Sequence, residues 1–464
     1  MLLQLHFSNE KCINIDIFPL KFVEIPVKME IMKRSAYIEL LAWKNSSDRK
    51  PLLLQGGRQV GKTWLMEEFG KNEFRNVISL NFEKNPGLSA FFNEDIDPVN
   101  IIKSLEQHYD STISPKDTLI IFDEVQESGR ALNSLKYFCE EAPQYHIIAA
   151  GSFLGVASHG SFPVGKVDRI TLYPLSFYEF LEGTGNARYV EAIKNQDFEL
   201  VRAISGDYEK FLKTYFFVGG MPKAVAAYAA RENLREVRTI QSDILADYRD
   251  DFSKHISPVN TPKVQMTWNS IPRHLSKEKK KFVYKELKTG ARAYAFEDAM
   301  SWLFDTHLVY KVSRTEENNL PLASYADEGT FKLYMLDIGL FGAKSELDVS
   351  ALSEPNNKLF GIFNGAMAEQ FVMQELKAAG FTPYYWGREK GAAELDFVVQ
   401  WRNEIIPVEV KAGIRTKSKS LDVYRSLYHP AHAVRTTLKN FGIADDLYSV
   451  PLYMMASLRE ILEK

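Results

Sequence analysis

The chain has 464 residues, of which 25% are charged and 45% hydrophobic, and its formal net charge is −3. This length predicts about three domains, and the nearly balanced charge excludes a protein-wide basic surface, so nucleic-acid binding would need a local patch. The two cysteines, Cys12 and Cys139, lie far apart and no apolar run is long enough to span a bilayer, which argues against a disulfide framework and favours a cytoplasmic protein with no membrane association.

The N-terminal segment, residues 1–28, precedes Met29 and a predicted helix, "SAYIELLAWKN". It lacks the charged-then-apolar layout of a signal peptide. Two interpretations stay open. The segment is either an upstream extension of the real start or a short strand pair that packs on the core.

A glycine-rich turn follows, between a predicted strand, "PLLLQ", and a predicted helix, "KTWLMEEF". Its sequence "GGRQVGKT" has the spacing GxxxxGK[ST], whose backbone amides wrap a phosphate chain at a helix N-terminus. Lys62 would reach the outer phosphates, Thr63 would offer a hydroxyl to Mg²⁺, and Gly70 suits the helix C-terminus. The predicted nucleotide-binding residues of this turn are Gly56, Gly57, Arg58, Gln59, Val60, Gly61, Lys62, Thr63 and Trp64.

A second motif, "TLIIFDEVQE", is a buried-type strand that ends in two acids. Asp123 at its tip would hold Mg²⁺ through water, and Glu124 would deprotonate the attacking water as a general base. A third strand, "YHIIAAGSFLG", ends near Ser152, a candidate contact for the γ-phosphate. With "VISLNFEKN" between the two motifs, the alternation of strands and helices predicts a parallel sheet that binds ATP at the carboxyl ends of its strands.

The order of these parts resembles that of AAA-type ATPases, in which a catalytic glutamate follows the metal-binding aspartate. The segments "GGRQVGKT", "LIIFDEVQE", "AAGSFLG", "LYPLSFYEF" and "YFFVGGMPKAV" together resemble a prokaryotic family that joins such an ATPase to a C-terminal domain of unknown function. The resemblance implies an ATPase domain over residues 29–185. It also implies an arginine that acts on a neighbouring subunit of a homo-oligomer. The matching position holds Lys166, with Arg169 three residues on, and lysine lacks arginine's bidentate fork, so whether Lys166, Arg169 or neither has this role stays open.

Residues 186–320 are predicted to be helical with a winged-helix-like end. The stretch 208–254 has a helical pattern, which the sequence "GGMP" at 219–222 breaks into two helices. Next, "FVYKELKT" predicts a short helix, and "AFEDAMSWLFDTHLVYKVS" predicts a second helix that leads into a strand.

This order of elements resembles a winged-helix module, whose second helix could enter a DNA groove. A basic run, "SKEKKKF" at 276–282, lies nearby. However, the second helix carries Glu297, Asp298 and Asp305, which phosphates would repel. Contact with DNA and contact with protein both stay open for this module.

Residues 321–464 are predicted to form a second α/β domain. A helix, "IFNGAMAEQFVMQELKAAGF", precedes two strand-like segments, "AAELDFVVQ" and "NEIIPVEVKAG". Residues two apart in a strand point the same way, so Glu409 and Lys411 share a face, and Asp396 on the neighbouring strand can meet them. The acids would hold Mg²⁺, the lysine would steady developing negative charge, and Glu369 on the helix could add a metal ligand.

This acid, gap, then E-x-K pattern resembles the core of restriction-endonuclease-like nucleases, which Glu369, Asp396, Glu409 and Lys411 match position by position. The resemblance implies phosphodiester cleavage in which Asp396, Glu409 and Lys411 are catalytic. The alternative is a salt-bridged strand pair in an inactive copy of the fold. A basic stretch over residues 411–425 would either follow a nucleic-acid backbone or be a solvated loop.

The sequence therefore predicts an α/β protein with a P-loop NTPase parallel sheet, a helical and winged-helix-like middle, and a restriction-endonuclease-like C-terminal domain. We expect a Mg²⁺-dependent ATPase that couples ATP to a nuclease-like module acting on DNA. One alternative is an ATP-dependent regulatory switch whose nuclease-like domain is an inactive binding platform. A third is a protein-remodelling ATPase.

Overall fold

The structure, a computed structural model, describes residues 33–93, 95–152, 163–349, 362–388, 393–413 and 418–463. The segment 1–28, with its two open interpretations, lies outside the described residues. So do Arg415 and Lys417 of the predicted basic stretch.

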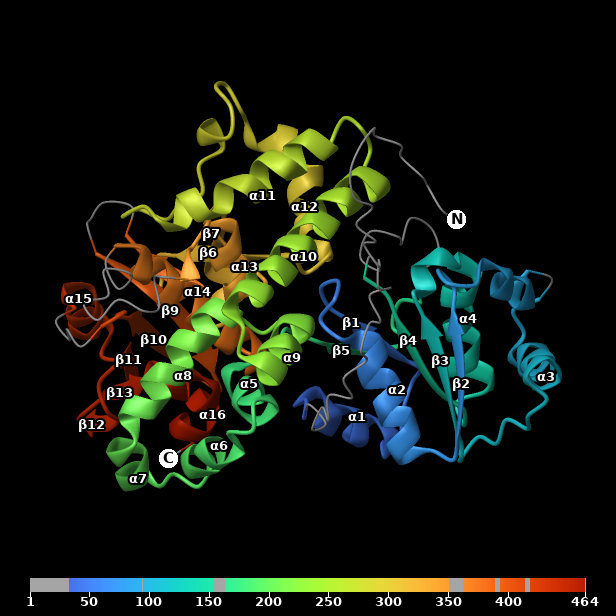
Figure 1. Ribbon diagram of the computed structural model, residues 1–464. Helices are drawn as coiled ribbons and strands as arrows, with labels where there is room; N and C mark the ends of the chain where they lie inside the picture. Colours follow the sequence, from blue (N-terminus) through green and yellow to red (C-terminus); the bar gives the residue numbers. More distant parts are fainter. Residues whose placement is uncertain are drawn as a thin grey trace, which may run out of the picture.

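A five-stranded sheet forms the N-terminal part of the molecule (Figure 1). Its order is β2-β3-β4-β1-β5 and every neighbouring pair is parallel. The strands are β1 (Leu52–Gln55), β2 (Asn76–Asn81), β3 (Thr118–Asp123), β4 (His146–Ala150) and β5 (Asp168–Thr171). β3 is buried along its whole length, as expected of a strand covered on both faces. The predicted parallel sheet is confirmed.

Helices cover both faces of this sheet because successive strand residues point to opposite sides. Leu52 and Leu54 pack in one core with α1 (Ala36–Lys44) and α2 (Lys62–Glu73). Leu53 packs in another with α3 (Pro98–Tyr109) and α4 (Gly129–Glu141). The prediction that Gly70 ends its helix is wrong, since α2 continues to Glu73. A Cβ at Gly70 would lie 2.8 Å from Val77 Cγ2, so this glycine allows α2 to approach β2 closely.

The middle of the chain is helical, as predicted. Its helices are α5 (Phe177–Gly183), α6 (Ala187–Lys194), α7 (Phe198–Ala203), α8 (Ser205–Val218), α9 (Pro222–Arg231), α10 (Leu234–His255), α11 (Thr261–Leu275) and α12 (Glu297–Asp305). The stretch 208–254 contains three helices rather than the two predicted. Asn233 makes the second break because its side chain accepts hydrogen bonds from the backbone N–H groups of Arg235 and Glu236 and caps α10.

A mixed eight-stranded sheet forms the C-terminal part, in the order β12-β13-β11-β10-β9-β8-β6-β7. Its strands are β6 (Val309–Thr315), β7 (Ala326–Met335), β8 (Tyr384–Gly387), β9 (Glu394–Trp401), β10 (Glu404–Val410), β11 (Ala433–Thr437), β12 (Gly442–Ala444) and β13 (Leu447–Pro451). Its helices are α13 (Ile338–Lys344), α14 (Ile362–Ala378), α15 (Lys419–Tyr428) and α16 (Leu458–Leu462).

The strand expected to close the winged-helix-like unit belongs to this sheet. α12 and β6 follow one another as predicted, but β6 pairs with β7 on one side and with β8 on the other. The predicted boundary at 320/321 thus falls between two paired strands. "FVYKELKT" holds a short 3-10 turn over Tyr284–Glu286 in place of the predicted helix.

Two of the family-like segments, "LYPLSFYEF" and "YFFVGGMPKAV", meet the start of α13 at the turn between α8 and α9. The Gly220 amide donates a 2.6 Å hydrogen bond to Asp337, at the start of α13, and the Gly220 carbonyl accepts one of 2.7 Å from the Leu175 amide. The Tyr215 hydroxyl donates a 2.5 Å bond to the Leu175 carbonyl. A Cβ at Gly220 would lie 2.1 Å from the Leu175 carbonyl oxygen, so only glycine fits. This joint connects the N-terminal, middle and C-terminal parts of the chain.

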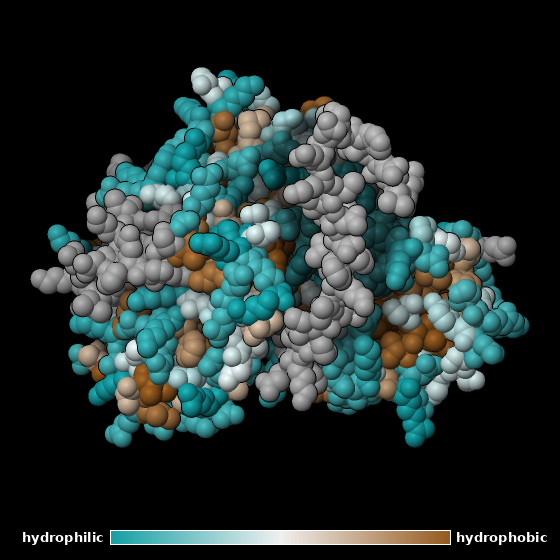
Figure 2. Space-filling view, viewed as in Figure 1, coloured by the Kyte–Doolittle hydropathy of each residue, from teal (hydrophilic) through white to brown (hydrophobic). Residues whose placement is uncertain are grey.

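On the face of the molecule that Figure 2 shows, most of the coloured surface is hydrophilic, and hydrophobic residues form separate patches. None of the described helices is long and apolar enough to cross a membrane.

Candidate functional site

The glycine-rich turn forms a cradle between β1 and α2. Gly56 has φ 142° and Gly61 has φ 97°, and both are backbone conformations that favour glycine. A Cβ at Gly56 would lie 2.2 Å from the Leu172 carbonyl oxygen, and one at Gly57 would lie 2.7 Å from Leu336 Cδ1. The turn is therefore packed against β5's end on one side and against the C-terminal part of the chain on the other.

Lys62 is buried inside this turn. Its ammonium group donates to the carbonyl oxygens of Gly56 and Gly57, both at 2.9 Å, and to the Ser152 hydroxyl at 3.1 Å. Burial lowers the pKa of Lys62 to about 8. The negative charges of Glu124 and Asp123 oppose this shift, because they favour the ammonium form. A buried cation held by neutral carbonyl groups is a ready partner for a phosphate.

Asp123 lies at the tip of β3 and faces the start of α2. Its Oδ2 atom accepts hydrogen bonds from the Thr63 hydroxyl at 2.9 Å and from the Asn81 side chain at 2.8 Å. Burial raises the pKa of Asp123, while these hydrogen bonds oppose the shift. The structure thus brings together Lys62 and Thr63, at the start of α2, with Asp123 and Ser152, at the ends of β3 and β4, as the sequence predicts.

Glu124, the predicted general base, lies next to this group with a positive φ of 49°. Its carboxylate accepts a 2.7 Å hydrogen bond from the Gln126 side chain. Gln126 was not expected from the sequence. It holds the Glu124 carboxylate by a contact between two residues of the same turn.

Helix α10 contacts the outer side chains of the turn. Arg58 forms an ion pair of 2.6 Å with Asp251, and the Gln59 side chain donates a 2.7 Å hydrogen bond to Asp247. The Tyr248 hydroxyl donates a 2.8 Å bond to the Arg58 carbonyl. Asp251 is 6% exposed, and burial raises its pKa to about 6. A helix of the middle region therefore holds the predicted phosphate-binding turn from outside.

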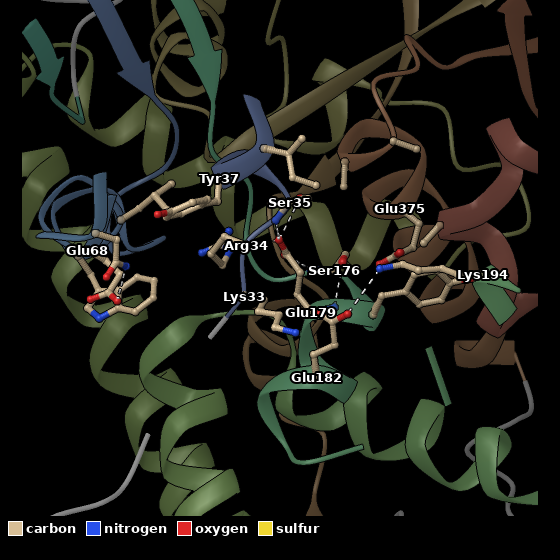
Figure 3. A pocket seen from close by; sticks show the side chains of 18 residues that line it. Lys33, Arg34, Ser35, Tyr37, Glu68, Ser176, Glu179, Glu182, Lys194 and Glu375 are labelled. Atoms are coloured by element: carbon tan, nitrogen blue, oxygen red, sulfur yellow. Dashed lines mark hydrogen bonds and ion pairs between the residues drawn. The ribbon is translucent and has the colours of Figure 1, made fainter. Parts of the chain in front are cut away.

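Trp64, the last residue of the predicted set, lines a cavity of about 540 Å³. Arg34 also lines this cavity. It forms an ion pair of 3.3 Å with Glu179 and donates a hydrogen bond to the carbonyl of Val60, which is buried in the turn. Figure 3 shows Arg34, Ser35 and Glu179 in the cavity wall. Glu375 of α14 also lines it. One Glu375 oxygen accepts from the Phe177 amide and the other is buried without a partner.

The carboxylates of the predicted C-terminal site also lie together. The Val410 amide donates a 2.8 Å hydrogen bond to Asp396, and the Lys411 ammonium pairs with Glu409 at 2.5 Å. Burial raises the pKa of Asp396 well above its usual value, and the charges of Glu369 and Glu409 raise it further. The shared face expected for Glu409 and Lys411 is present.

Lysines neutralise this acidic cluster. Lys280 forms an ion pair with Glu369, and Lys332, 1% exposed, pairs with Glu394 at 2.7 Å. Burial raises the pKa of Glu369, but Lys280 and Lys332 outweigh it and hold that pKa below its usual value. Within the described ranges, no group of three or more His, Cys, Asp or Glu side chains is arranged to hold a metal ion. The metal-binding role of Glu369, Asp396 and Glu409 stays a prediction.

The candidate arginine-finger positions lie near β5. Lys166 forms a 2.9 Å ion pair with Glu140, and Arg169 lies within β5 itself. Neither side chain is among the predicted nucleotide-binding residues or their hydrogen-bond partners described above.

Sequence reasoning missed Gln126, which contacts Glu124 within the same turn. It also missed six residues that contact a site from a distant part of the chain: Arg34, Asn81, Asp247, Asp251, Lys280 and Lys332. A signal existed for Lys280, because it belongs to the basic run at 276–282.

Three stretches of the chain match known protein families. Residues 48–181 match an AAA domain, and this match contains β1 to β5 with Lys62 and Asp123. This stretch is an AAA-type P-loop ATPase domain. Residues 209–351 and 364–455 match two domains of unknown function, DUF8612 and DUF4143. The acids Glu369, Asp396 and Glu409 all lie in the DUF4143 stretch.

Solved structures with similar folds include a Walker-type ATPase of Pyrococcus abyssi, at 13% identity and a TM-score of 0.44, covering 68% of this chain and 97% of that one. The ORC1 protein of Aeropyrum pernix in complex with DNA has 10% identity and a TM-score of 0.26, covering 68% and 92%. Drosophila ORC bound to DNA has 13% identity and a TM-score of 0.27, covering 68% and 95%. A comparison with curated proteins found no match.

Proposed function

We propose that the protein is a Mg²⁺-dependent ATPase that transmits its nucleotide state through α10 to the C-terminal module. The contact between Thr63 and Asp123, 60 residues apart in sequence and 2.9 Å apart in space, carries this proposal. It supports a phosphate-binding turn and an acidic strand tip that act on one ligand. Lys62 in the same turn supplies the cation that the phosphates require.

The donor set suits Mg²⁺. The Thr63 hydroxyl and the Asp123 carboxylate are hard oxygen ligands, which Mg²⁺ prefers, and few protein ligands are needed when phosphates complete the shell. When bound, the ion would neutralise charge on the phosphates. The chain's own residues would do the remaining work. Lys62 would bind the outer phosphates, and Ser152, now its hydrogen-bond partner, would lie beside them.

Glu124 would orient the attacking water and take its proton as the water oxygen bonds to phosphorus. Gln126 would release Glu124 for this role. The sugar and base would leave the turn along α2, toward the cavity lined by Trp64 and Arg34, whose volume of about 540 Å³ leaves room for them.

The α10 contacts support transmission to the rest of the chain. A triphosphate in the turn would draw on the same Arg58 and Gln59 that now bind Asp251 and Asp247. Charge-assisted hydrogen bonds of this kind are strong enough to bias a two-state element. We therefore expect the position or order of α10 to depend on bound ATP.

The test is hydrogen exchange of the full chain with and without ATP, together with ATP turnover with and without DNA. We expect ATP to change the exchange rates of α10 amides severalfold, and Asp251→Ala to remove most of that change. Asp250→Ala, an exposed neighbour on the same helix, is the matched control. If ATP changes the exchange of α10 equally in the wild-type protein, Asp251→Ala and Asp250→Ala, the proposed transmission through α10 is overturned. Failure to bind or hydrolyse ATP at all would overturn the ATPase.

The pH dependence of ATP binding is a further expected result. Phosphates favour the ammonium form of Lys62, whose pKa in the free protein is about 8. Binding above that pH must therefore take up one proton, so affinity falls as pH rises, by up to about tenfold per unit. A fluorescent ATP analogue titrated between pH 7.5 and 9.5 measures this. Lys62→Arg, which stays charged, should bind with a flat profile if it binds, and a flat wild-type profile would contradict the prediction.

A second candidate function is DNA cleavage by the C-terminal module. The cluster of Glu369, Asp396, Glu409 and Lys411 supports it, because acids and a lysine at one sheet face suit phosphodiester chemistry. The lysine pairs described above favour the alternative, an inactive platform, for the conformation seen here. Plasmid nicking with Mg²⁺ separates the two. A nuclease loses cleavage in Asp396→Ala or Lys411→Ala, whereas a platform never cleaves.

A further inference from the structure

Glu375 brings a carboxyl group of the C-terminal part of the chain into the cavity of about 540 Å³ beside α2 (Figure 3). It lies on α14, inside the stretch that matches DUF4143. Trp64 and Leu65 of α2 and Tyr178 of α5 line the same cavity and belong to the stretch that matches the AAA domain. Both family modules therefore build the wall of this cavity.

The cavity adjoins the phosphate-binding turn. Trp64 directly follows Thr63, the last residue of the glycine-rich motif. Arg34 of the cavity wall donates a 3.0 Å hydrogen bond to the carbonyl of Val60 in the turn, and its side chain lies 3.6 Å from the position of a Cβ on Gly61. A ligand whose phosphates occupy the turn thus has this cavity as a neighbouring space for its other end.

Hydrogen bonds to backbone amides fix the place of Glu375. Its Oε1 atom accepts a 3.0 Å hydrogen bond from the amide of Phe177, the first residue of α5. The preceding residue, Gln374, accepts a 3.0 Å hydrogen bond from the amide of Ile338 and donates one of 2.7 Å to the Tyr215 hydroxyl. The carboxyl group is therefore held in place before any ligand binds, and its second oxygen has a defined position.

That second oxygen, Oε2, is buried and has no hydrogen-bond partner among the described residues. Glu375 is 0% exposed. Burial, together with the negative charge of Glu179, raises the pKa of Glu375 to about 8, against the opposing hydrogen bond from Phe177. At neutral pH the side chain is therefore an uncharged acid, in which Oε1 accepts from the amide and Oε2 carries the proton. A buried O–H group without an acceptor is unfavourable, and it indicates an acceptor that a ligand would supply.

The rest of the cavity wall indicates the chemistry of that ligand. Two of its cations are already paired, Arg34 with Glu179 at 3.3 Å and Lys194 with Glu182 at 3.5 Å. Apolar walls with a few placed polar groups suit a flat aromatic ring with an acceptor atom. The aromatic and aliphatic side chains that line the cavity include those of Tyr37, Trp64, Leu65, Tyr178, Ala378 and Ala379.

We propose that Glu375 recognises the adenine base of ATP by donating a hydrogen bond from Oε2 to a ring nitrogen of the base. This inference rests on the proposed function, under which the phosphates occupy the turn and the base extends along α2 into the cavity. It adds a residue of the C-terminal module to the nucleotide site. ATP then contacts the AAA domain through its phosphates and the C-terminal module through its base, a link that does not pass through α10.

Binding of ATP and of inorganic tripolyphosphate to the full, nucleotide-free chain tests the proposal, with both affinities measured by calorimetry. Tripolyphosphate occupies the turn only. We expect wild type to bind ATP at least tenfold more tightly than tripolyphosphate. Glu375→Leu removes the donor, so it should weaken ATP binding at least fivefold and leave tripolyphosphate binding unchanged. The amide of Glu375→Gln accepts and donates like the uncharged acid and should keep ATP affinity within twofold. Glu460→Leu, an exposed acid on α16, should resemble wild type with both ligands.

Analogues of ATP that lack one ring nitrogen identify the acceptor. We expect one of 1-deaza-, 3-deaza- and 7-deaza-ATP to bind wild type at least fivefold more weakly than ATP does. The same analogue should bind Glu375→Leu as tightly as ATP binds that variant, because the hydrogen bond is already absent. Such a cycle of one protein change and one ligand change isolates the contact between the two groups.

Three results would overturn the proposal. One is equal binding of all three analogues and ATP to wild type. Another is a Glu375→Leu variant that loses ATP and tripolyphosphate affinity equally, as expected of a residue that only supports the start of α5. The third is a Glu375→Gln variant that loses as much ATP affinity as Glu375→Leu. If Glu375→Leu does not fold, the analogue series on wild type and Glu375→Gln decides. Wild type that binds neither ATP nor tripolyphosphate overturns the proposed ATPase and this inference with it, whereas equal affinity for the two ligands overturns this inference alone.

Discussion

Glu124→Gln is expected to bind ATP with nearly wild-type affinity and to hydrolyse it at least about a hundredfold more slowly, the usual contribution of a general base. Glutamine keeps the size and hydrogen-bonding groups of the side chain but cannot accept the proton of the attacking water. Lys62, Thr63 and Asp123, which would hold the phosphates and Mg²⁺, are untouched. Phosphate release and binding of a fluorescent ATP analogue measure the two effects separately.

Two further variants serve as controls for this result. Lys62→Ala removes the cation of the turn and should lose ATP binding as well as turnover. Glu127→Gln changes an exposed acid three residues beyond Glu124 and should leave both unchanged. Turnover by Glu124→Gln within twofold of wild type would show that another group takes the proton.

Gly220→Ala is expected to lower the free energy of unfolding by about 3 kcal/mol or more, the upper range for overpacking a core. The added methyl group would lie 2.1 Å from the Leu175 carbonyl oxygen, a backbone atom that cannot rotate away. Relief of that clash would break the hydrogen bonds that Gly220 makes to Leu175 and Asp337. Chemical denaturation followed by tryptophan fluorescence measures the loss.

Gly206→Ala is the matched control for this substitution. Gly206 lies within α8, and nothing lies within 4 Å of an added Cβ. Alanine is favoured over glycine inside a helix, so this variant should be as stable as wild type or slightly more stable. Equal stability of Gly220→Ala and Gly206→Ala would show that the joint between the parts of the chain tolerates a side chain.

The AAA domain could be predicted from the sequence because its signals are local. The strand, the glycine-rich turn and the helix are adjacent in the chain, and the acidic strand tip follows a continuous apolar run. Parallel strands then bring Asp123 to the same sheet edge as Thr63 without further information. The sequence also predicts that Asp396 and Glu409 lie together, because they belong to β9 and β10, which are consecutive in the chain and pair as antiparallel neighbours.

The remaining features depend on contacts between distant segments, for which a single sequence holds no periodic signal. The ion pair between Arg58 and Asp251 of α10 joins residues that are 193 positions apart in the sequence. The pairing of β6 with β8 joins two strands that are separated in the sequence by β7, α13 and α14. Lys280 looked like part of a solvated basic run, because its burial follows only from the course of the chain past β7. The Asn233 cap was a local signal that the sequence interpretation did not use.

The pairing of β6 with β7 and β8 has a practical consequence for dissecting the molecule. A fragment that starts at residue 321 would lack β6. The strands β7 and β8, which pair with β6, would then each have an unpaired backbone edge, and such edges promote aggregation. A C-terminal fragment that retains the complete eight-stranded sheet must begin before Val309, where β6 starts. Such a piece would also have to retain the 276–282 run if its acidic face is to be studied with the lysine in place.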